Sequence, residues 1–280
     1  MSKRLHNNHR PSSQNKPKKT MGSQKVQGEL WGKRPNDWAA YQEKTAIPGY
    51  NYALDFLKLN QSNHLLDVGC GSGLFCKIAS EKGVNVTGID ASENLITEAK
   101  KRTNSVKFLT GEMEELPFDN EIFDVVTGFN SFQYASNIKN ALVEAARVLK
   151  KNGKLVTMIW GNKEDCELFG HFKAMGSLMP PPPPGSAGPF ALSENKLLEN
   201  NLEEAGFKIL VSTDVPCICE YPNTEIAMKA LLSSGPSGKV IDQVGFEKTH
   251  ETALASIQDF IQDNGQVVIK NKFRVVISEK

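Results

Sequence analysis

The chain has no long apolar run, few cysteines and no recognisable targeting signal. No stretch approaches the roughly 18 consecutive apolar residues typical of a membrane helix, and the N-terminus lacks the apolar core of a secretory signal. The five cysteines are odd in number and scattered, which argues against a disulfide framework. No Cys or His cluster has the spacing of a metal site. We therefore expect a cytoplasmic protein with no membrane span, bound metal or disulfide.

Acidic residues are absent from residues 1–28, which hold seven of the chain's 33 basic residues. This stretch is rich in Asn, Ser, Gln and Pro, so it cannot bury apolar surface and is expected to be a disordered tail. A basic tail can contact nucleic-acid phosphates, although a solvated tail is the commoner outcome. Residues 29–280 are long enough for one α/β domain with additions.

The most informative stretch, 64–74, reads His-Leu-Leu-Asp-Val-Gly-Cys-Gly-Ser-Gly-Leu. An apolar strand runs into Gly69, Gly71 and Gly73, and a helical pattern of apolar residues follows at once. Glycine is suited to places where a backbone turns sharply or lies against a ligand, because it has no Cβ. A strand, a glycine turn and a helix at the start of a β-α-β unit are typical of a nucleotide-type binding site.

The glycine spacing bears on which nucleotide is bound. A dinucleotide fingerprint has the form G-x-G-x-x-G, but the sixth position here is Leu74 and the third glycine comes one residue early, at Gly73. Asp67, at the carboxyl end of the strand, is expected to face the ligand. Its carboxylate suits a ligand with an amino group better than a pyrophosphate, since like charges repel. A nicotinamide-dependent reductase is therefore the weaker alternative.

Further elements follow at the distances expected for a doubly wound sheet. Strands are predicted over 84–89, 106–110, 123–127 and 155–159, and helices from residue 93 and over 138–149. The basic stretch Lys150–Lys154, which contains Gly153, is expected to end the second helix. Asp90, at the end of the second strand, is predicted to accept the ribose hydroxyls. Its alternative role is a cap for the helix that follows.

Together these motifs resemble a class I S-adenosylmethionine-dependent methyltransferase, of the group that includes quinone-biosynthesis C-methyltransferases and many small-molecule methyltransferases. The matching segments are Leu66–Gly73, Gly88–Asp90, Gly111–Phe118, Phe123–Val126 and Leu149–Leu155. The resemblance implies an α/β fold with a Rossmann-like, doubly wound, mostly parallel seven-stranded sheet whose last strand is antiparallel. It also implies S-adenosylmethionine as the cofactor.

The resemblance assigns cofactor contacts to eleven positions. These are Asp67, Gly69, Cys70, Gly71, Gly73, Asp90, Ala91, Glu112, Met113, Phe129 and Asn130. The glycines would form a wall for the methionine part, Asp67 would face its ammonium group, Asp90 would bind the ribose and Ala91 would line the adenine. Cys70 is interpreted as a small wall residue, and not as a nucleophile.

Two of these motifs carry particular expectations. At the position of Glu112, relatives have an Asp that accepts from the adenine amino group, and Glu112 is expected to make the same contact. The backbone N–H of Met113 would donate to a ring nitrogen of the adenine. The carbonyl of Phe129 would accept from the cofactor ammonium, with Asn130 beside it.

The acceptor side must come from segments outside these motifs. Two insertions, 161–195 and a mainly helical 223–264, are predicted to cap the acceptor pocket, with the stiff run Pro180–Pro184 in the first. Residues 29–52 are rich in Trp and Tyr, and form either a lid over the cofactor or a helix packed on the sheet.

The sequence assigns no catalytic residue, because methyl transfer from a sulfonium depends mostly on positioning. Gln133, Tyr134 and His171 are candidates for the pocket, with His171 expected on a surface loop. The run 129–134 lacks the Asn-Pro-Pro-Tyr pattern of base or glutamine methyltransferases and the Pro-Cys of cytosine enzymes. A small-molecule acceptor is therefore favoured. RNA methylation that uses the basic tail, and a noncatalytic cofactor-binding module, are the alternatives.

Overall fold

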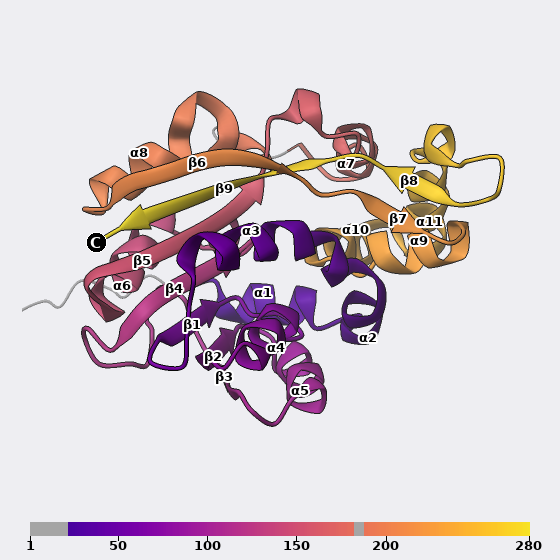
Figure 1. Ribbon diagram of the computed structural model, residues 1–280. Coiled ribbons are helices and arrows are strands. Elements are labelled where there is room, and N and C mark those ends of the chain that lie inside the picture. The colour runs from indigo at the N-terminus through magenta and orange to yellow at the C-terminus, as the bar shows by residue number, and fades with distance from the viewer. Residues whose placement is uncertain (1–21, 182–187) are drawn as a thin grey trace, which may run out of the picture.

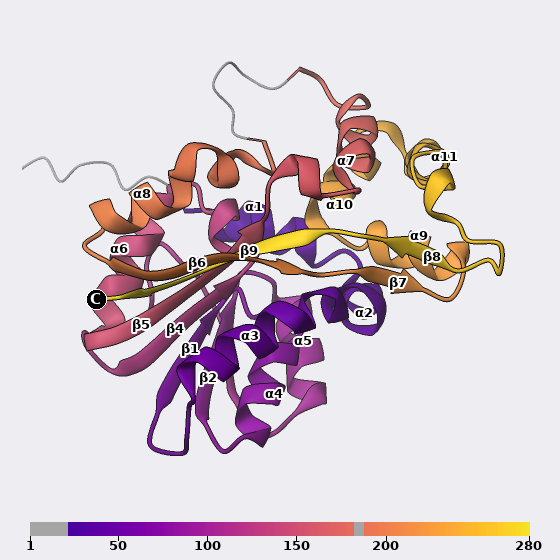
Figure 2. The same ribbon diagram turned by 45° about the horizontal axis from the view of Figure 1, so that its top comes forward.

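The computed structural model describes residues 22–181 and 188–280 (Figures 1 and 2). Most of the predicted basic tail and most of the Pro180–Pro184 run therefore lie outside the described residues. Within the described part, helix α1 spans Gln24–Trp31. The boundary predicted for the tail at residue 28 is thus wrong, because residues 24–28 are helical and pack against the rest of the protein.

A seven-stranded sheet in the order β3-β2-β1-β4-β5-β9-β6 forms the centre of the molecule. Its strands are β1 His64–Val68, β2 Asn85–Asp90, β3 Lys107–Thr110, β4 Phe123–Phe129, β5 Leu149–Trp160, β6 Lys208–Pro216 and β9 Lys272–Glu279. Strands β1 to β5 are parallel, and β9 is antiparallel to both of its neighbours. The predicted doubly wound sheet with an antiparallel last strand is confirmed.

Helices cover both faces of this sheet (Figure 2). On one face lie α3 Ile47–Leu57, α4 Leu74–Glu81 and α5 Glu93–Arg102, and on the other lie α6 Ile138–Val148 and α8 Leu197–Glu204. Two apolar cores fill the spaces between the helices and the sheet. In α6 the apolar face predicted from helical spacing is buried against the sheet. Parallel strands buried on both faces account for the continuous apolar runs in the sequence.

The end of α6 differs from the prediction. The helix stops at Val148, and Leu149 already pairs with Phe123 as the first residue of β5. The basic residues after it belong to the strand, where Lys150 pairs with Asp124. Strand pairing at the sheet has overridden the local signal of a basic, glycine-containing helix terminus, a choice that only tertiary contacts make.

Described parts of the two insertions, together with the short strands that flank the second one, form a smaller unit beyond the carboxyl ends of β5 and β6 (Figure 1). It contains α7 Phe169–Gly176, the two-stranded sheet of β7 Cys219–Tyr221 and β8 Val267–Ile269, and helices α9 Thr224–Leu231, α10 Gly235–Val244 and α11 Phe246–Ala255. The helical character predicted for 223–264 is confirmed. These elements share a third apolar core of their own.

His171 lies in this unit, and its predicted place on a surface loop is wrong. It sits in α7 with a side chain that is 2% exposed, and its Nδ1 lies 2.8 Å from the Ser256 hydroxyl. Burial lowers the pKa of His171 to about 4, so the ring is neutral. The side chain ties α7 to the end of α11.

The N-terminal segment crosses the carboxyl edge of the sheet. After α1 come α2 Pro35–Asp37, a π-turn Trp38–Gln42 and a 3-10 turn Glu43–Ala46, and then α3. Contacts of α1 with α10 and of the π-turn with α9 join this segment to the second insertion. All five cysteines are free. No helix among the described residues is long and apolar enough to cross a membrane.

Candidate functional site

The glycine loop between β1 and α4 has a left-handed backbone at all three glycines. The φ angles of Gly69, Gly71 and Gly73 are +74°, +53° and +77°, which L residues with a side chain rarely adopt. A Cβ on Gly69 would also stand 2.3 Å from the Cβ of Ser131, and one on Gly73 would stand 2.9 Å from the Cβ of Ala99. The loop is therefore fixed both by its own conformation and by close packing.

Asp90 joins the glycine loop to the loop that follows β2. One oxygen accepts from the backbone N–H of Gly71 at 2.9 Å, and the other accepts from Ser92 N at 2.8 Å. The cap of α5 is Ser92, whose hydroxyl accepts from Leu95 N, so Asp90 does not cap the helix itself. The backbone N–H of Ala91 also interacts with this carboxylate. Since a carboxylate offers about four acceptor positions, about one remains for a ligand hydroxyl.

Asp67 lies beneath the glycine loop and is 2% exposed. Its Oδ1 accepts from the Thr127 hydroxyl at 2.7 Å, and its Oδ2 lies 3.4 Å from the Cys76 sulfur. This geometry differs from the expected side chain open to a ligand, since both oxygens have partners inside the protein. Burial, reinforced by the nearby carboxylates of Glu43 and Asp90, raises the pKa of Asp67 to about 7 against the effect of the two hydrogen bonds.

Cys70 and Ala91 line the same corner. Burial raises the pKa of Cys70 to about 11, so its thiol stays protonated and fits the predicted wall residue better than a nucleophile. Ala91 is covered by α1, because a Cβ added to Gly28 would stand 2.4 Å from the Ala91 carbonyl oxygen. The N-terminal helix therefore lies directly over the wall assigned to the adenine.

Glu112 contacts α1 as well, which the sequence did not predict. Its Oε2 accepts from the backbone N–H of Gln24 at 2.6 Å, and its Oε1 accepts from the Ser23 hydroxyl at 3.3 Å. A negative charge at a helix N-terminus is favourable, so Glu112 fastens α1 onto the site. Met113 is partly buried and packs against the second core.

The end of β4 supplies Phe129 and Asn130. Phe129 packs between Tyr50 and Phe75, with ring centroids 4.6 Å and 4.5 Å away. Asn130 has a left-handed φ of +53°. Its Oδ1 is buried without a hydrogen-bond partner among the described residues, and the same holds for Oε1 of Gln133 in the short turn that follows. Unpaired buried acceptors are rare in folded proteins and call for an explanation.

Two residues of the N-terminal segment were not assigned to the site from the sequence, namely Glu43 and Trp38, of which Trp38 was noted only among the aromatic residues of 29–52. Glu43 is 4% exposed, forms an ion pair of 2.7 Å with Arg102 and accepts from the Ser72 hydroxyl inside the glycine loop. Burial raises its pKa, while the Arg102 guanidinium opposes that rise. No sequence signal marks the Glu43–Arg102 ion pair, because the two residues are 59 positions apart and neither belongs to a motif.

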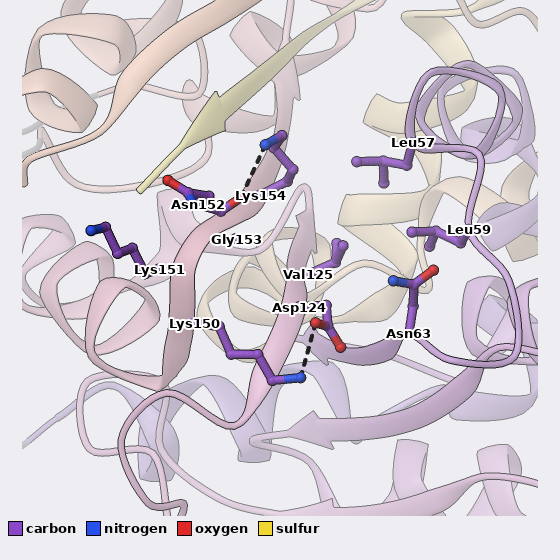
Figure 3. A pocket seen from close by; sticks show the side chains of 10 residues that line it. All are labelled: Leu57, Leu59, Asn63, Asp124, Val125, Lys150, Lys151, Asn152, Gly153 and Lys154. Carbon is purple, nitrogen blue, oxygen red and sulfur yellow. Dashed lines mark hydrogen bonds and ion pairs between the residues drawn. The ribbon is translucent and has the colours of Figure 1, made fainter.

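The structure thus brings most of the predicted residues to one place, the carboxyl edge of β1, β2 and β4. A depression of about 260 Å³ lies at the opposite, amino edge, lined in part by Asp124, Lys150 and Lys154 (Figure 3). It contains none of the residues assigned to the cofactor. A doubly wound sheet binds its ligands at the carboxyl edge, so the glycine loop is the candidate site.

The sheet order, the antiparallel β9 and the glycine loop with Asp90 define a class I methyltransferase type of α/β protein. Comparison with known proteins agrees, since residues 66–157 match the family model described as a methyltransferase domain. The chain therefore contains an S-adenosylmethionine-dependent methyltransferase domain of class I.

Curated relatives and solved structures point the same way. The chain is 30% identical to a demethylmenaquinone methyltransferase of Renibacterium salmoninarum over 51% of this chain and 65% of that protein. It is 26% identical to the O-methyltransferase resE of Aspergillus sclerotiorum, over 72% and 74%. A malonyl-[acyl-carrier protein] O-methyltransferase of Buchnera aphidicola is 31% identical over 46% of this chain, which spans about half of that relative's length, 51%.

Two solved structures share the fold at low identity. The YcgJ protein of Bacillus subtilis gives a TM-score of 0.55 at 18% identity, over 82% of this chain and 97% of that one. The [4+2]-cyclase SpnF gives 0.56 at 20% identity, over 91% and 92%. At this identity the likeness concerns the fold alone.

The buried Glu43–Arg102 pair should contribute strongly to stability. Replacing Arg102 with Met keeps helix propensity but leaves the Glu43 carboxylate buried without its cation, so we expect a loss of about 3–5 kcal/mol in the free energy of unfolding. Its neighbour Lys101 is exposed and pairs with Glu98. Lys101→Met should therefore cost less than about 1 kcal/mol. Urea unfolding of both variants measures the difference, and equal losses would contradict the assignment.

Asp67 should make stability depend on pH. Its folded pKa, about 7, lies above the ordinary 3.8, so the folded state holds a proton that the unfolded chain releases between about pH 4 and 7. The contribution is complete below pH 4 and is lost as the pH rises to 7, at about 1.4 kcal/mol per pH unit. Relative to Asp67→Asn, the wild type should be less stable at pH 8 than at pH 5 in urea unfolding.

Asp124 provides a control, because its contribution to stability should change with pH in the opposite direction. Burial disfavours its ionisation, but the Lys150 ammonium and the His64 N–H outweigh that effect and lower its pKa. Stability from Asp124 is therefore present at neutral pH and is lost on acidification. If the wild type and Asp67→Asn keep the same pH profile, the raised pKa of Asp67 is refuted.

Proposed function

We propose that this chain transfers a methyl group from S-adenosylmethionine to an oxygen, nitrogen or carbon of a small-molecule acceptor. The observation that carries the proposal is the convergence, at one sheet edge, of the left-handed glycine loop, Asp90 and the end of β4. In the matched family this edge holds the cofactor.

The residues at this edge fit the cofactor in charge and in hydrogen bonding. S-adenosylmethionine carries a sulfonium and an ammonium group, and Asp67 and Asp90 are buried carboxylates with no ion-pair partner among the described side chains. The unpaired Oδ1 of Asn130 and Oε1 of Gln133 offer acceptors for an ammonium group. A cationic ligand would relieve the cost of burying these groups.

Within this proposal the residues contact different parts of the cofactor. The backbone of Gly69, Gly71 and Gly73 lies against the methionine half, and the Asp90 carboxylate accepts from the ribose hydroxyls. Asp67 lies beneath the loop, where a bound cation would favour its ionised form. When bound, the cofactor supplies an already activated methyl group.

The adenine and ammonium ends complete the assignment. Ala91 and the Met113 backbone line the space for the adenine. Glu112 holds α1, which covers that space. The Phe129 carbonyl and the Asn130 side chain accept from the ammonium group. Because the cofactor's methyl group is already activated, the protein has only to align the acceptor and exclude water.

No general base is assigned. His171 is engaged with Ser256 inside the second unit, and burial raises the pKa of Tyr134, which keeps its hydroxyl protonated. An acceptor that is already deprotonated, or whose proton is lost easily, needs no such base.

The insertions 161–195 and 223–264 are proposed to cap the acceptor pocket. In their favour, the described parts lie beyond the carboxyl ends of β5 and β6 and contact the N-terminal segment that covers the glycine loop. If the cap sets acceptor choice, replacing Pro180–Pro184 with Gly-Ser should raise KM for the acceptor and leave the cofactor Kd unchanged. An unaltered KM would mean that the run has no part in acceptor binding.

Asp90 gives a direct test of cofactor binding. Asp90→Ala removes the ribose acceptors, so S-adenosylmethionine should bind roughly 5- to 150-fold more weakly by calorimetry, about 1–3 kcal/mol. Asp124→Ala, at the opposite edge (Figure 3), is the matched control and should leave the affinity unchanged. An Asp90 variant with wild-type affinity would place the ribose elsewhere.

The acceptor class is tested by labelled methyl transfer. Wild-type protein, S-adenosylmethionine labelled in its methyl group, and cell extract separated into small molecules, RNA and protein should give label in the small-molecule fraction. Label in RNA, lost when residues 1–21 are removed, would favour a nucleic-acid substrate. Binding without transfer to any fraction would favour a noncatalytic module or another reaction, since one fold hosts several chemistries.

A further inference from the structure

Trp38 places an unpartnered hydrogen-bond donor over the glycine loop. Its indole Nε1 is buried and has no partner among the described residues. The same nitrogen would stand 3.4 Å from a Cβ built on Gly71, and the other atom near that point is Oε1 of Glu43, at 3.2 Å. Gly71 is thus the glycine whose missing side chain opens toward these two N-terminal residues, whereas Gly69 and Gly73 face the domain's own core.

The chain fixes this indole in position through a network that reaches four elements. The backbone N–H of Glu43 donates to the Trp38 carbonyl, the i→i+5 bond of a π-turn, which sets both side chains against the loop. The Glu43 carboxylate accepts from Ser72 and, at 3.4 Å, from Leu74 N. Arg102 donates both to Glu43, at 2.7 Å, and to the Ala39 carbonyl, at 3.1 Å.

The charge balance indicates which ligand group the indole suits. An indole N–H is only a donor, so its partner must be an acceptor, and an anionic acceptor gives the stronger bond. The Glu43 charge beside it is neutralised by Arg102, so an incoming anion is not repelled. The acceptors Asn130 and Gln133, by contrast, suit a cation. A ligand with an ammonium and a carboxylate on neighbouring atoms carries a partner for each set.

We propose that Trp38 binds the carboxylate of the cofactor's methionine half through its Nε1–H, and that Glu43 and Arg102 are positioning residues for this contact. The inference rests on the proposed function. It extends the cofactor site beyond the matched domain, residues 66–157, into the N-terminal segment. The competing role for Trp38 is packing alone, since its ring contacts Trp31 edge to face at 4.9 Å.

The test compares two ligands that differ only in the carboxylate. Calorimetry with S-adenosylmethionine and with decarboxylated S-adenosylmethionine is run on the wild type, Trp38→Phe and Trp31→Phe. Trp38→Phe should bind S-adenosylmethionine about ten- to a hundredfold more weakly and bind the decarboxylated form as the wild type does. Trp31 is the matched control, because its indole N–H already donates to Gln27 at 3.2 Å. Its variant should not change the ratio of the two affinities.

A second measurement uses the unaltered indole. The chain has three tryptophans, so their indole N–H resonances can be assigned with Trp31→Phe and Trp160→Phe. The Trp38 signal should move downfield with S-adenosylmethionine and stay in place with the decarboxylated form. If Trp38→Phe loses affinity for both ligands equally, or if the Trp38 resonance does not move, this inference alone is overturned. A wild type that binds neither ligand contradicts the proposed function, and this inference with it.

Discussion

The left-handed backbone of the glycine loop is the constraint on which the rest of this structure depends. Positive φ angles at Gly69, Gly71 and Gly73 let the chain leave β1, reverse and enter α4 within a few residues. The same conformation points the Gly71 N–H at Asp90 and leaves the loop open toward the N-terminal segment. The ends of β1 and β2 are thereby held together, which fixes the relative positions of the residues assigned to the cofactor.

Three buried carboxylates surround this loop, and only Glu43 has a cationic partner among the residues that the structure describes. Glu43 is paired with Arg102, while Asp67 and Asp90 are held by hydrogen bonds from uncharged groups. Burial raises the pKa of all three. A site with this imbalance favours a cationic ligand over a neutral or anionic one, because a positive charge reduces the cost of ionising the buried acids. The same imbalance argues against a pyrophosphate.

The N-terminal segment covers the candidate site and contributes side chains to it. Glu112 holds the start of α1, Glu43 holds the following turn on the glycine loop, and α3 packs on the sheet with Tyr50 buried against Phe129. Of the two interpretations left open for the aromatic residues 29–52, packing on the sheet holds for α3, while α1 and the turn after it lie over the residues assigned to the cofactor. Because α1 also contacts α10, the segment links the cofactor side of the molecule to the insertions. A ligand at the glycine loop and an acceptor under the insertions would thus share one neighbour.

The sequence by itself determined the order of the strands and helices, the glycine loop and the family, because periodicity and turn chemistry are local. Tertiary structure decided the rest. Lys150 became a strand residue through pairing with β4, His171 was buried by contact with α11, and Glu112 was taken up by the N-terminus of α1. Trp38, Glu43 and Arg102 meet only after folding, since no local pattern records that residues 59 positions apart will share a buried charge. Local signals determine which elements form, whereas the partner of a buried polar group depends on the burial that the whole fold creates.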